Sequence, residues 1–400
     1  QVPPELKRGV LCSAGPIAAM AVCLTLLSGE PAPVEARQGE SVGEVRARLA
    51  DALSMPLTRV KLLAQEGPLS DRDILEEGVV QVVLRRVERY LFVAEAGSSR
   101  ISRWSLDSPS GGGTGDDEGV QVIGFQGGGS REDQLGNPRG IAVEPSGTIY
   151  VAEAINDRVT RWPLWSVRGE VVAGGLGWGE GPEQLSNPVG IFITDDHILY
   201  VSEYWNHRVM RWEPGAARGT VVAGGRGPGD SLQQLKHPDG IHVDARGNLY
   251  VCEYGNHRVT RWAPDASSGE VVAGGRRGAE LENLNSPSGI FVDPQGVVYV
   301  SEHQNHRVSR WVPSAACGEI VAGGSGFGFG QEHLACPRGV FVDADGAVYV
   351  SEEVSHRVSC WIPGATYCEI VAGGKGDGDR ADQLSSPFGI CVIEQGIESL

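Results

Sequence analysis

The sequence predicts a mainly β protein, in which a six-bladed β-propeller follows a small α+β domain. Three observations support this prediction. The phrase E-x-x-N-H-R-V-x-R-W returns at residues 203–212, 253–262 and 302–311, and degenerate copies extend it. The closing tryptophans are 58, 50, 50, 49 and 50 residues apart, and each repeat divides into four strand patterns. A period near fifty without a helix-length segment is typical of radial β-repeats.

One repeat shows the four expected strands in order. Pro238–Val243 has the inner-strand pattern P-x-G-I-x-V, and Leu249–Glu253 alternates the β-branched and aromatic residues that pack on a pleated sheet. Arg258–Trp262 follows a turn at Asn256-His257, and residues 271–273 precede a flexible Gly-Gly. Four antiparallel strands per repeat make one propeller blade.

The strand count predicts how the ring closes. Inner strands start at Pro138, Pro188, Pro238, Pro287, Pro337 and Pro387, and outer strands contain Trp104, Trp162, Trp212, Trp262, Trp311 and Trp361. The last inner strand, 387–393, has no outer strands after it, and the first outer strands, 90–104, have no inner strand before them. We therefore expect these two segments to pair within a propeller that spans 89–400, which removes free sheet edges.

The repeat resembles a known family. Residues 237–259, H-P-D-G-I-H-V-D-A-R-G-N-L-Y-V-C-E-Y-G-N-H-R-V, are similar to the NHL repeat, and the resemblance covers 90–393. It departs from the family where Glu replaces the usual Asp after the second strand and where residues 108–119 add a loop. The resemblance implies protein recognition, often as the substrate-binding part of a ubiquitin ligase, while some relatives bind RNA.

Residues 20–88 have a different pattern. Strands are expected at 21–27, around Val34, at 59–63 and at Val79–Leu84, and an amphipathic helix is expected from Ser41 to about Leu53. Ser41 and Glu44 have the spacing of a capping box at the start of this helix. The order of elements resembles a ubiquitin-like β-grasp domain over about 20–86. Arg85-Arg86 runs on into the propeller instead of ending in a free Gly-Gly, so the resemblance implies a docking module for ubiquitin or proteasome machinery.

Composition indicates a cytoplasmic protein. The eight cysteines occupy unrelated repeat positions without C-x-x-C spacing, so neither a zinc ribbon nor a RING module is encoded. Residues 1–19 are predicted to be a disordered leader. Residues 10–27, an apolar stretch after Lys7-Arg8, also have the character of a signal or anchor, which leaves a secreted or membrane-anchored protein as the alternative.

The charge of the propeller argues against nucleic acid as a partner. Residues 90–400 carry 23 basic and 39 acidic side chains, almost the whole formal net charge of −17. Binding to phosphate backbones relies on clustered Lys and Arg. An RNA-binding role is therefore a minor alternative.

The repeated polar residues are expected to be structural. His207, His257, His306 and His356 occupy the same turn of successive blades, too far apart to share one metal ion, so hydrogen bonding between blades is favoured. Each repeated glutamate precedes an arginine by five residues, and the pair should close the turn between the second and third strands. The tryptophans should fill the core between blades.

The variable residues are the candidate binding site. The x positions of P-x-G lie at one mouth of the central channel, together with the second-to-third turns and the loops between blades. Aromatic and arginine side chains there are typical of protein-interface anchors. The partner-binding candidates are Arg139, Trp178, Tyr204, Trp205, Asp239, Tyr254, Arg276, His303, Phe327 and Arg338.

Two classes of function remain open. The first is a noncatalytic adaptor, whose propeller binds a protein or peptide while the β-grasp domain docks to the ubiquitin system. The alternative is a metal-dependent enzyme of the six-bladed type, a lyase or lactonase. Such enzymes need several histidine or oxygen ligands at the channel mouth, whereas the x positions here offer no histidine and only Asp239. We therefore predict no catalytic residue, metal or cofactor, and no membrane partner.

Overall fold

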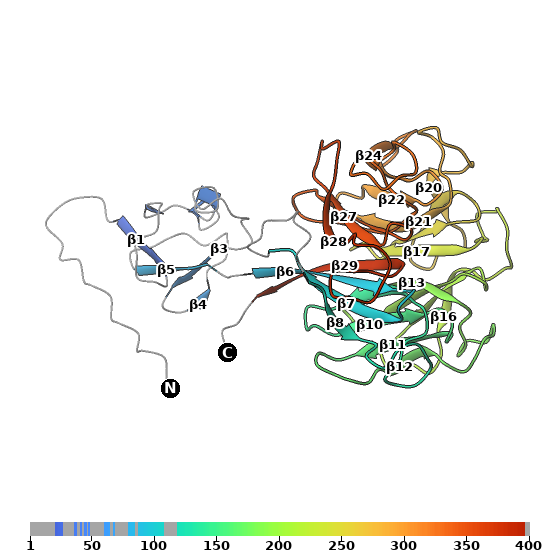
Figure 1. Ribbon diagram of the computed structural model, residues 1–400. Helices are drawn as coiled ribbons and strands as arrows, with labels where there is room; N and C mark the ends of the chain where they lie inside the picture. The colour runs from blue at the N-terminus through green and yellow to red at the C-terminus, as the bar shows by residue number, and fades with distance from the viewer. Residues whose placement is uncertain are drawn as a thin grey trace, which may run out of the picture. The chain divides into compact units, whose positions relative to one another are not determined.

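The computed structural model describes side chains at Ser41, Glu44, Val45, Ala47 and Arg48 and over 89–107 and 118–394, and it gives further strands between residues 21 and 88 and up to residue 396. The chain forms two compact units, one of residues 1–88 with 395–400 and one of Arg89–Glu394. The larger one is a six-bladed propeller of four-stranded antiparallel sheets (Figure 1).

The blades are named here by their closing tryptophans. The Trp162 blade contains β9 (Pro138–Val143), β10 (Ile149–Glu153), β11 (Arg158–Trp162) and β12 (Glu170–Gly174). The Trp212 blade contains β13 (Pro188–Ile193), β14 (Leu199–Glu203), β15 (Arg208–Trp212) and β16 (Thr220–Gly224). The Trp262 blade contains β17 (Pro238–Val243), β18 (Leu249–Glu253), β19 (Arg258–Trp262) and β20 (Glu270–Gly274).

The other three blades repeat this order. The Trp311 blade contains β21 (Pro287–Val292), β22 (Val298–Glu302), β23 (Arg307–Trp311) and β24 (Glu319–Gly323). The Trp361 blade contains β25 (Pro337–Val342), β26 (Val348–Glu352), β27 (Arg357–Trp361) and β28 (Glu369–Gly373). The Trp104 blade has the order β29 (Pro387–Gly396), β6 (Val87–Glu95), β7 (Arg100–Ser105) and β8 (Val120–Ile123).

The Trp104 blade closes the ring with strands from the two ends of the propeller sequence. Figure 1 draws the red β29 beside the cyan β6, and the two are hydrogen-bonded neighbours in one sheet. Backbone N–H groups of Ala96 and Gly97 donate to the carbonyl oxygens of Ser386 and Ser385 at 3.2 Å. Unlike the predicted inner strand, which ends at Ile393, β29 continues to Gly396.

A buried glutamate–arginine pair closes each second-to-third turn, as predicted. In the Trp262 blade, Arg258 Nε donates to Glu253 Oε1 at 2.8 Å, and Glu253 is fully buried. The Arg258 guanidinium also donates to the carbonyl oxygens of Asp230 and Ser231 in the loop that enters the blade. The same pair is present in all six blades: Glu95–Arg100, Glu153–Arg158, Glu203–Arg208, Glu253–Arg258, Glu302–Arg307 and Glu352–Arg357.

The turn histidines join successive blades, which confirms their predicted structural role. His257 Nδ1 accepts a hydrogen bond from the backbone N–H of Ser286, the residue before the inner strand of the next blade. His207, His306 and His356 make the equivalent contact, and Asp157 accepts it through its carboxylate in the Trp162 blade. His257 adopts a φ of 53°, which puts its backbone in the left-handed region.

The tryptophans fill the space between blades, as predicted. Trp262 is 3% exposed and packs with Val209 and Leu235, which precede its own blade in the chain. Its indole Nε1 donates to Thr260 Oγ1 at 3.1 Å. In the Trp212 blade Met210 takes the place of this threonine, and the buried Trp212 Nε1 has no hydrogen-bond partner among the described residues.

The smaller unit contains one five-stranded sheet. Its strands are β1 (Ala21–Leu26), β2 (Ala36–Arg37), β3 (Val60–Ala64), β4 (Gly67–Pro68) and β5 (Val79–Leu84). They follow the order β2-β1-β5-β3-β4, with β1 and β5 parallel. Ser41 and Glu44 form the predicted capping box, because each donates its backbone N–H to the other's side chain.

Several predictions for this unit lie outside the described residues: the leader 1–19, the strand position Val34 and the helix beyond Arg48. Among the described residues, no helix combines the length and apolar character needed to cross a membrane.

Replacing Trp262 with alanine should strongly destabilise the propeller. The substitution removes a large buried ring and leaves a cavity, which costs about 3–5 kcal/mol of unfolding free energy. Trp165→Ala is the matched control, since Trp165 is 84% exposed and its loss should cost less than about 0.5 kcal/mol. Denaturant titration of both variants measures the two effects. Equal losses would contradict a packed role for Trp262.

Candidate functional site

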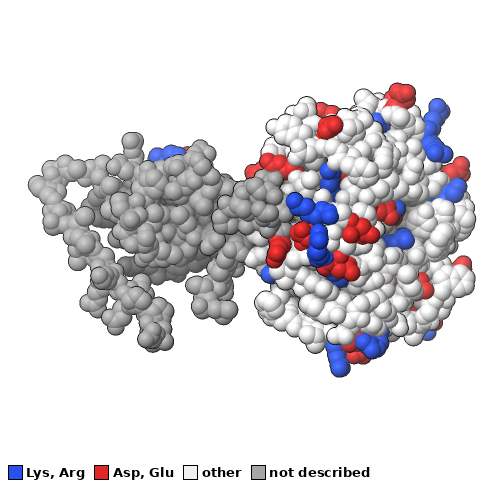
Figure 2. Space-filling view, in the orientation of Figure 1, with Lys and Arg blue, Asp and Glu red and all other residues white. Residues whose placement is uncertain are grey.

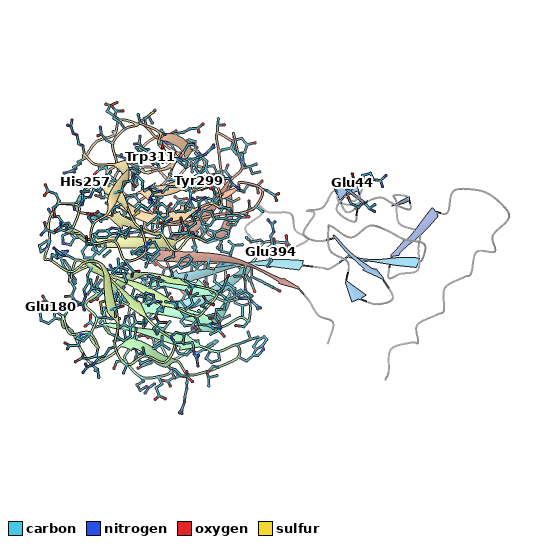
Figure 3. All side chains as sticks on the ribbon, turned by 180° about the vertical axis from the view of Figure 1, so that it is seen from behind. Glu44, Glu180, His257, Tyr299, Trp311 and Glu394 are labelled. Atoms are coloured by element: carbon cyan, nitrogen blue, oxygen red, sulfur yellow. The ribbon has the colours of Figure 1, made fainter. Side chains whose placement is uncertain are left out.

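The propeller has two ends with different sets of loops. The mouth face carries the second-to-third turns, the loops between blades and the start of each inner strand, and the opposite face carries the other two turns of each blade. Glu394 lies near the end of β29. In Figure 3, His257 and Glu180 lie at the edge of the propeller that faces away from Glu394. His257 and Glu180 thus mark the mouth face.

The six x positions of P-x-G surround one small cavity at the axis. The cavity has a volume of about 90 Å³. Arg139, Val189, Asp239, Ser288, Arg338 and Phe388 line it, with the glycine and the aliphatic residue that follow each of them. Glycine is required because adjoining inner strands are so close: a Cβ on Gly190 would lie 2.4 Å from the Asp239 carbonyl oxygen.

Asp239 is the buried acidic group of this cavity. The residue is only 3% exposed. Its nearest ion-pair partner is Arg338, whose Nη1 atom lies 3.9 Å from Asp239 Oδ2. Burial raises the pKa of the Asp239 carboxyl to about 6, although Arg338 and Arg139 act in the opposite direction. The Ser202 hydroxyl of the preceding blade donates to the Asp239 carbonyl and fixes the backbone there.

Glu353 forms an ion-paired cluster beside the cavity. It accepts hydrogen bonds from Arg338 Nε at 2.8 Å and lies 2.7 Å from Arg338 Nη2. His303 Nε2 is 3.4 Å from the same carboxylate oxygen. The hydrogen bond with His303 and the charge of Arg338 lower the pKa of Glu353 to about 2, so it is ionised at neutral pH.

Two arginines frame Phe388. The Arg139 and Arg338 guanidinium carbons lie 5.2 and 4.8 Å from the centre of the Phe388 ring, within cation–π range. Arg139 Nε donates to Asn137 Oδ1, and burial lowers the pKa of Arg139. Both arginines are half-buried, so the aromatic ring holds two partly desolvated cations at the mouth.

An arc of aromatic rings continues from this cluster across three blades. The ring centre of Tyr204 is 4.9 Å from that of Trp205 and 6.2 Å from that of Tyr254, and Tyr254 lies 6.1 Å from His303. His237 stacks on Tyr204 at 4.5 Å. Trp205 is 56% exposed at the end of the arc. We call Trp205, Tyr204, His237, Tyr254 and His303 the aromatic arc.

The structure thus brings most of the candidate residues together. Arg139, Asp239 and Arg338 line the cavity, and Tyr204, Trp205, Tyr254 and His303 belong to the arc. Asp239 and His303 are buried, so their side chains lie below the surface. Trp178, Arg276 and Phe327 are exposed on loops between blades, and no described contact joins them to the arc.

Sequence reasoning missed Glu353 and His237 as site residues, and it placed Phe388 at the mouth without choosing it as a binding residue. Glu353 follows the repeated glutamate at the position where other blades have Tyr204, Tyr254 and His303, so alignment of the repeats could have identified it. It also missed a groove of about 660 Å³ on the opposite face, between the Trp262 and Trp311 blades. His242 lines that groove, and burial lowers its pKa to about 4.

The charged groups at the mouth do not fit a divalent metal ion. Asp239 faces two guanidinium groups, and the Glu353 carboxylate is occupied by Arg338 and His303. Calcium requires six to eight oxygen ligands without competing cations. Within the described residues, no three His, Cys, Asp or Glu side chains are grouped so as to hold a metal.

Comparison with known proteins identifies the fold. A family model described as SMP-30/Gluconolactonase/LRE-like region matches residues 182–275, and no curated protein matches the chain. A crystal structure of a nidogen/laminin complex is similar at a TM-score of 0.55 with 15% identity, over 76% of this chain and 98% of that chain.

Two further solved structures are similar at lower scores. A gluconolactonase from Xanthomonas campestris has a TM-score of 0.48 and 16% identity, over 70% of this chain and 87% of its own. A virginiamycin B lyase from Staphylococcus aureus, in a catalytically inactive form with quinupristin, has a TM-score of 0.40 and 13% identity, over 68% and 77% of the two chains.

Removing the charge of Asp239 or of Glu353 should change the pH dependence of stability in opposite directions. The folded-state pKa of Asp239, about 6, exceeds its ordinary value of 3.8, so the wild type loses stability as pH rises between these values. Asp239→Asn removes this loss. The unfolding free energy of the variant relative to wild type should therefore rise from pH 4 to pH 7, by at most about 3 kcal/mol.

Glu353→Gln is the counterpart. The folded-state pKa of Glu353, about 2, is below its ordinary value of 4.5, so its charge stabilises the wild type above pH 4.5 and this contribution disappears as pH falls. The variant should lose stability relative to wild type as pH rises from about 2 to 5, by less than about 3 kcal/mol because a third of the side chain is exposed. Melting curves across this range decide the signs; equal signs for the two variants would refute the assignment.

Proposed function

We propose that this protein is a noncatalytic adaptor that acts in the cytoplasm. Its propeller binds a protein or peptide at the mouth face, and its N-terminal unit is a ubiquitin-like domain that docks to ubiquitin or proteasome machinery. The bound partner would thereby be selected for ubiquitin-dependent turnover. The observation that carries the proposal is the aromatic arc, which ends in an exposed tryptophan and adjoins a buried charged cluster.

The mouth face has the composition of a protein-binding site. Aromatic and arginine side chains dominate the energy of protein interfaces, because they bury large areas at a small cost in conformational entropy. Here the turns that carry Tyr204, Tyr254 and His303 are fixed by the buried glutamate–arginine pairs, so they are ordered before binding. The similar solved structure is that of a nidogen/laminin complex, which supports a protein partner for a propeller of this kind.

Three features support a ubiquitin-like N-terminal unit. The sheet order β2-β1-β5-β3-β4 has the parallel pair β1 and β5 at its centre, the arrangement expected of a β-grasp domain. The capping box of Ser41 and Glu44 starts a helix after β2, where that fold has its helix. The NHL resemblance of the propeller points to the same ubiquitin system.

Two other functions have less support. The region matched at residues 182–275 favours a lactonase-like enzyme, but the guanidinium groups beside Asp239 would repel the metal ion that such a reaction needs. RNA binding requires a basic surface. On the face drawn in Figure 2, Lys and Arg side chains are interspersed with Asp and Glu.

Replacing Trp205, Tyr254 and Arg276 together with alanine should abolish partner capture and leave the melting temperature nearly unchanged. Aromatic and arginine anchors each cost about 2 kcal/mol or more when truncated, whereas partly exposed turn residues contribute little to the core. Affinity purification from cell extract, followed by mass spectrometry, compares the partners of the variant with those of the wild type.

The matched control is the triple variant Trp165→Ala, Tyr367→Ala and Arg246→Ala. It removes the same three residue types from exposed turns of the opposite face. The control should keep every partner. If the mouth variant also keeps every partner, recognition occurs elsewhere on the protein.

Removing residues 1–86 should separate the two halves of the proposal. The shortened chain should still capture the partner that binds the mouth face, because every residue of the aromatic arc remains. It should no longer co-purify with ubiquitin or proteasome components. Quantitative mass spectrometry of both purifications measures this. Full retention of those components would reject the docking role of the N-terminal unit.

A further inference from the structure

The cavity at the channel mouth and the Glu353 ion pair beside it together carry a balanced set of charges. Arg139 and Arg338 supply two positive charges, and Asp239 and Glu353 supply two negative ones. Arg338 is shared between the two carboxylates, at 2.7 Å from Glu353 and 3.9 Å from Asp239. A partner group that enters this cavity therefore meets a site whose net charge is already close to zero.

A charged partner group would disturb this balance. Asp239 is almost fully buried, and both arginines are half-buried, so an additional charge would be taken out of water without a free counter-ion. An unpaired charge in such surroundings is strongly unfavourable. A purely apolar group is also disfavoured, because it would cover the Asp239 carboxylate and the arginine donors without forming hydrogen bonds to them.

The cavity offers acceptors and donors side by side. The Asp239 carboxylate makes no short ion pair and can accept hydrogen bonds. The buried Ser288 hydroxyl lies beside it and helps to stabilise its charge. Arg139 uses its Nε on Asn137, and no described residue accepts from its two terminal nitrogens. A primary amide matches this set, because it carries two N–H donors and one carbonyl acceptor and has no charge.

We propose that the channel mouth binds the side-chain amide of an asparagine or glutamine of the partner. The amide N–H₂ group donates to Asp239, and the amide oxygen accepts from Arg139, while neighbouring partner residues lie on the aromatic arc. A volume of about 90 Å³ is enough for a small polar head group and is less than the roughly 150 Å³ of a cavity that holds a benzene ring. This inference rests on the proposed protein-binding function and names the group that the mouth selects.

Selection of random linear peptides on phage, with the full chain as bait, tests the inference. Wild-type protein should enrich peptides with Asn or Gln at one fixed position next to aromatic residues. Asp239→Asn leaves the cavity net positive and should shift that position to Asp or Glu. Arg139→Gln leaves it net negative and should shift the position to Lys or Arg.

A second measurement uses the wild-type protein alone, so it does not depend on how the variants fold. The strongest selected peptide and its Asn→Asp or Gln→Glu analogue are compared by calorimetry. The acidic analogue should bind at least about tenfold more weakly, since it places a carboxylate against Asp239. Equal affinities, or a preference for the charged analogue, would overturn the amide assignment.

The outcomes separate this inference from the proposed function. Peptides that lose binding to the Trp205, Tyr254 and Arg276 triple variant, yet show no amide preference, would overturn the amide assignment and leave protein binding at the mouth intact. If no selected peptide depends on the mouth face, both the amide assignment and the proposed recognition surface fail.

Discussion

The buried glutamate–arginine pair is the interaction on which the propeller depends. Each arginine closes the turn of its own blade through the glutamate and also donates to the carbonyl oxygens of the loop that arrives from the preceding blade. Because a buried charge is stable only when it is paired and hydrogen-bonded, the turn and the loop must keep one relative position. Six such pairs, together with the turn histidines, fix the angle between neighbouring blades around the ring.

This constraint leaves neighbouring positions free to differ. The residue after each glutamate donates its backbone N–H to the residue before a P-x-G proline in all six blades, so its backbone is held at the mouth. Its side chain, like that of the x of each P-x-G, differs from blade to blade. The chain uses these positions for Tyr204, Tyr254, His303 and Glu353 in one set and for Arg139, Asp239 and Arg338 in the other. A rigid symmetric ring therefore carries an asymmetric surface, with aromatic rings over three blades and charges at the axis.

The same geometry explains why the charged groups at the mouth do not fit a divalent metal ion. The carboxylates near the axis lie beside arginines and a histidine. Burial without a short ion pair raises the pKa of Asp239, whereas the contacts of Glu353 with both His303 and Arg338 lower its pKa. In the proposed function, groups arranged in this way discriminate between partner side chains by charge and hydrogen bonding. They cannot gather the oxygen ligands that a divalent ion needs.

The sequence by itself determined the strands, the number of blades and the structural role of the repeated residues, because Pro-x-Gly, the Glu–Arg spacing and the closing tryptophans recur in a fixed register. It also placed the variable residues at one end, since alternate strands of a meander end on the same face. Only the tertiary structure decided how those residues meet. Glu353 binds Arg338 of its own blade and His303, fifty residues away in the preceding blade, and Asp239 approaches Arg338 from two blades away. These contacts depend on the radius of the ring and the burial near its axis, which arise from packing between blades and have no pattern along the chain.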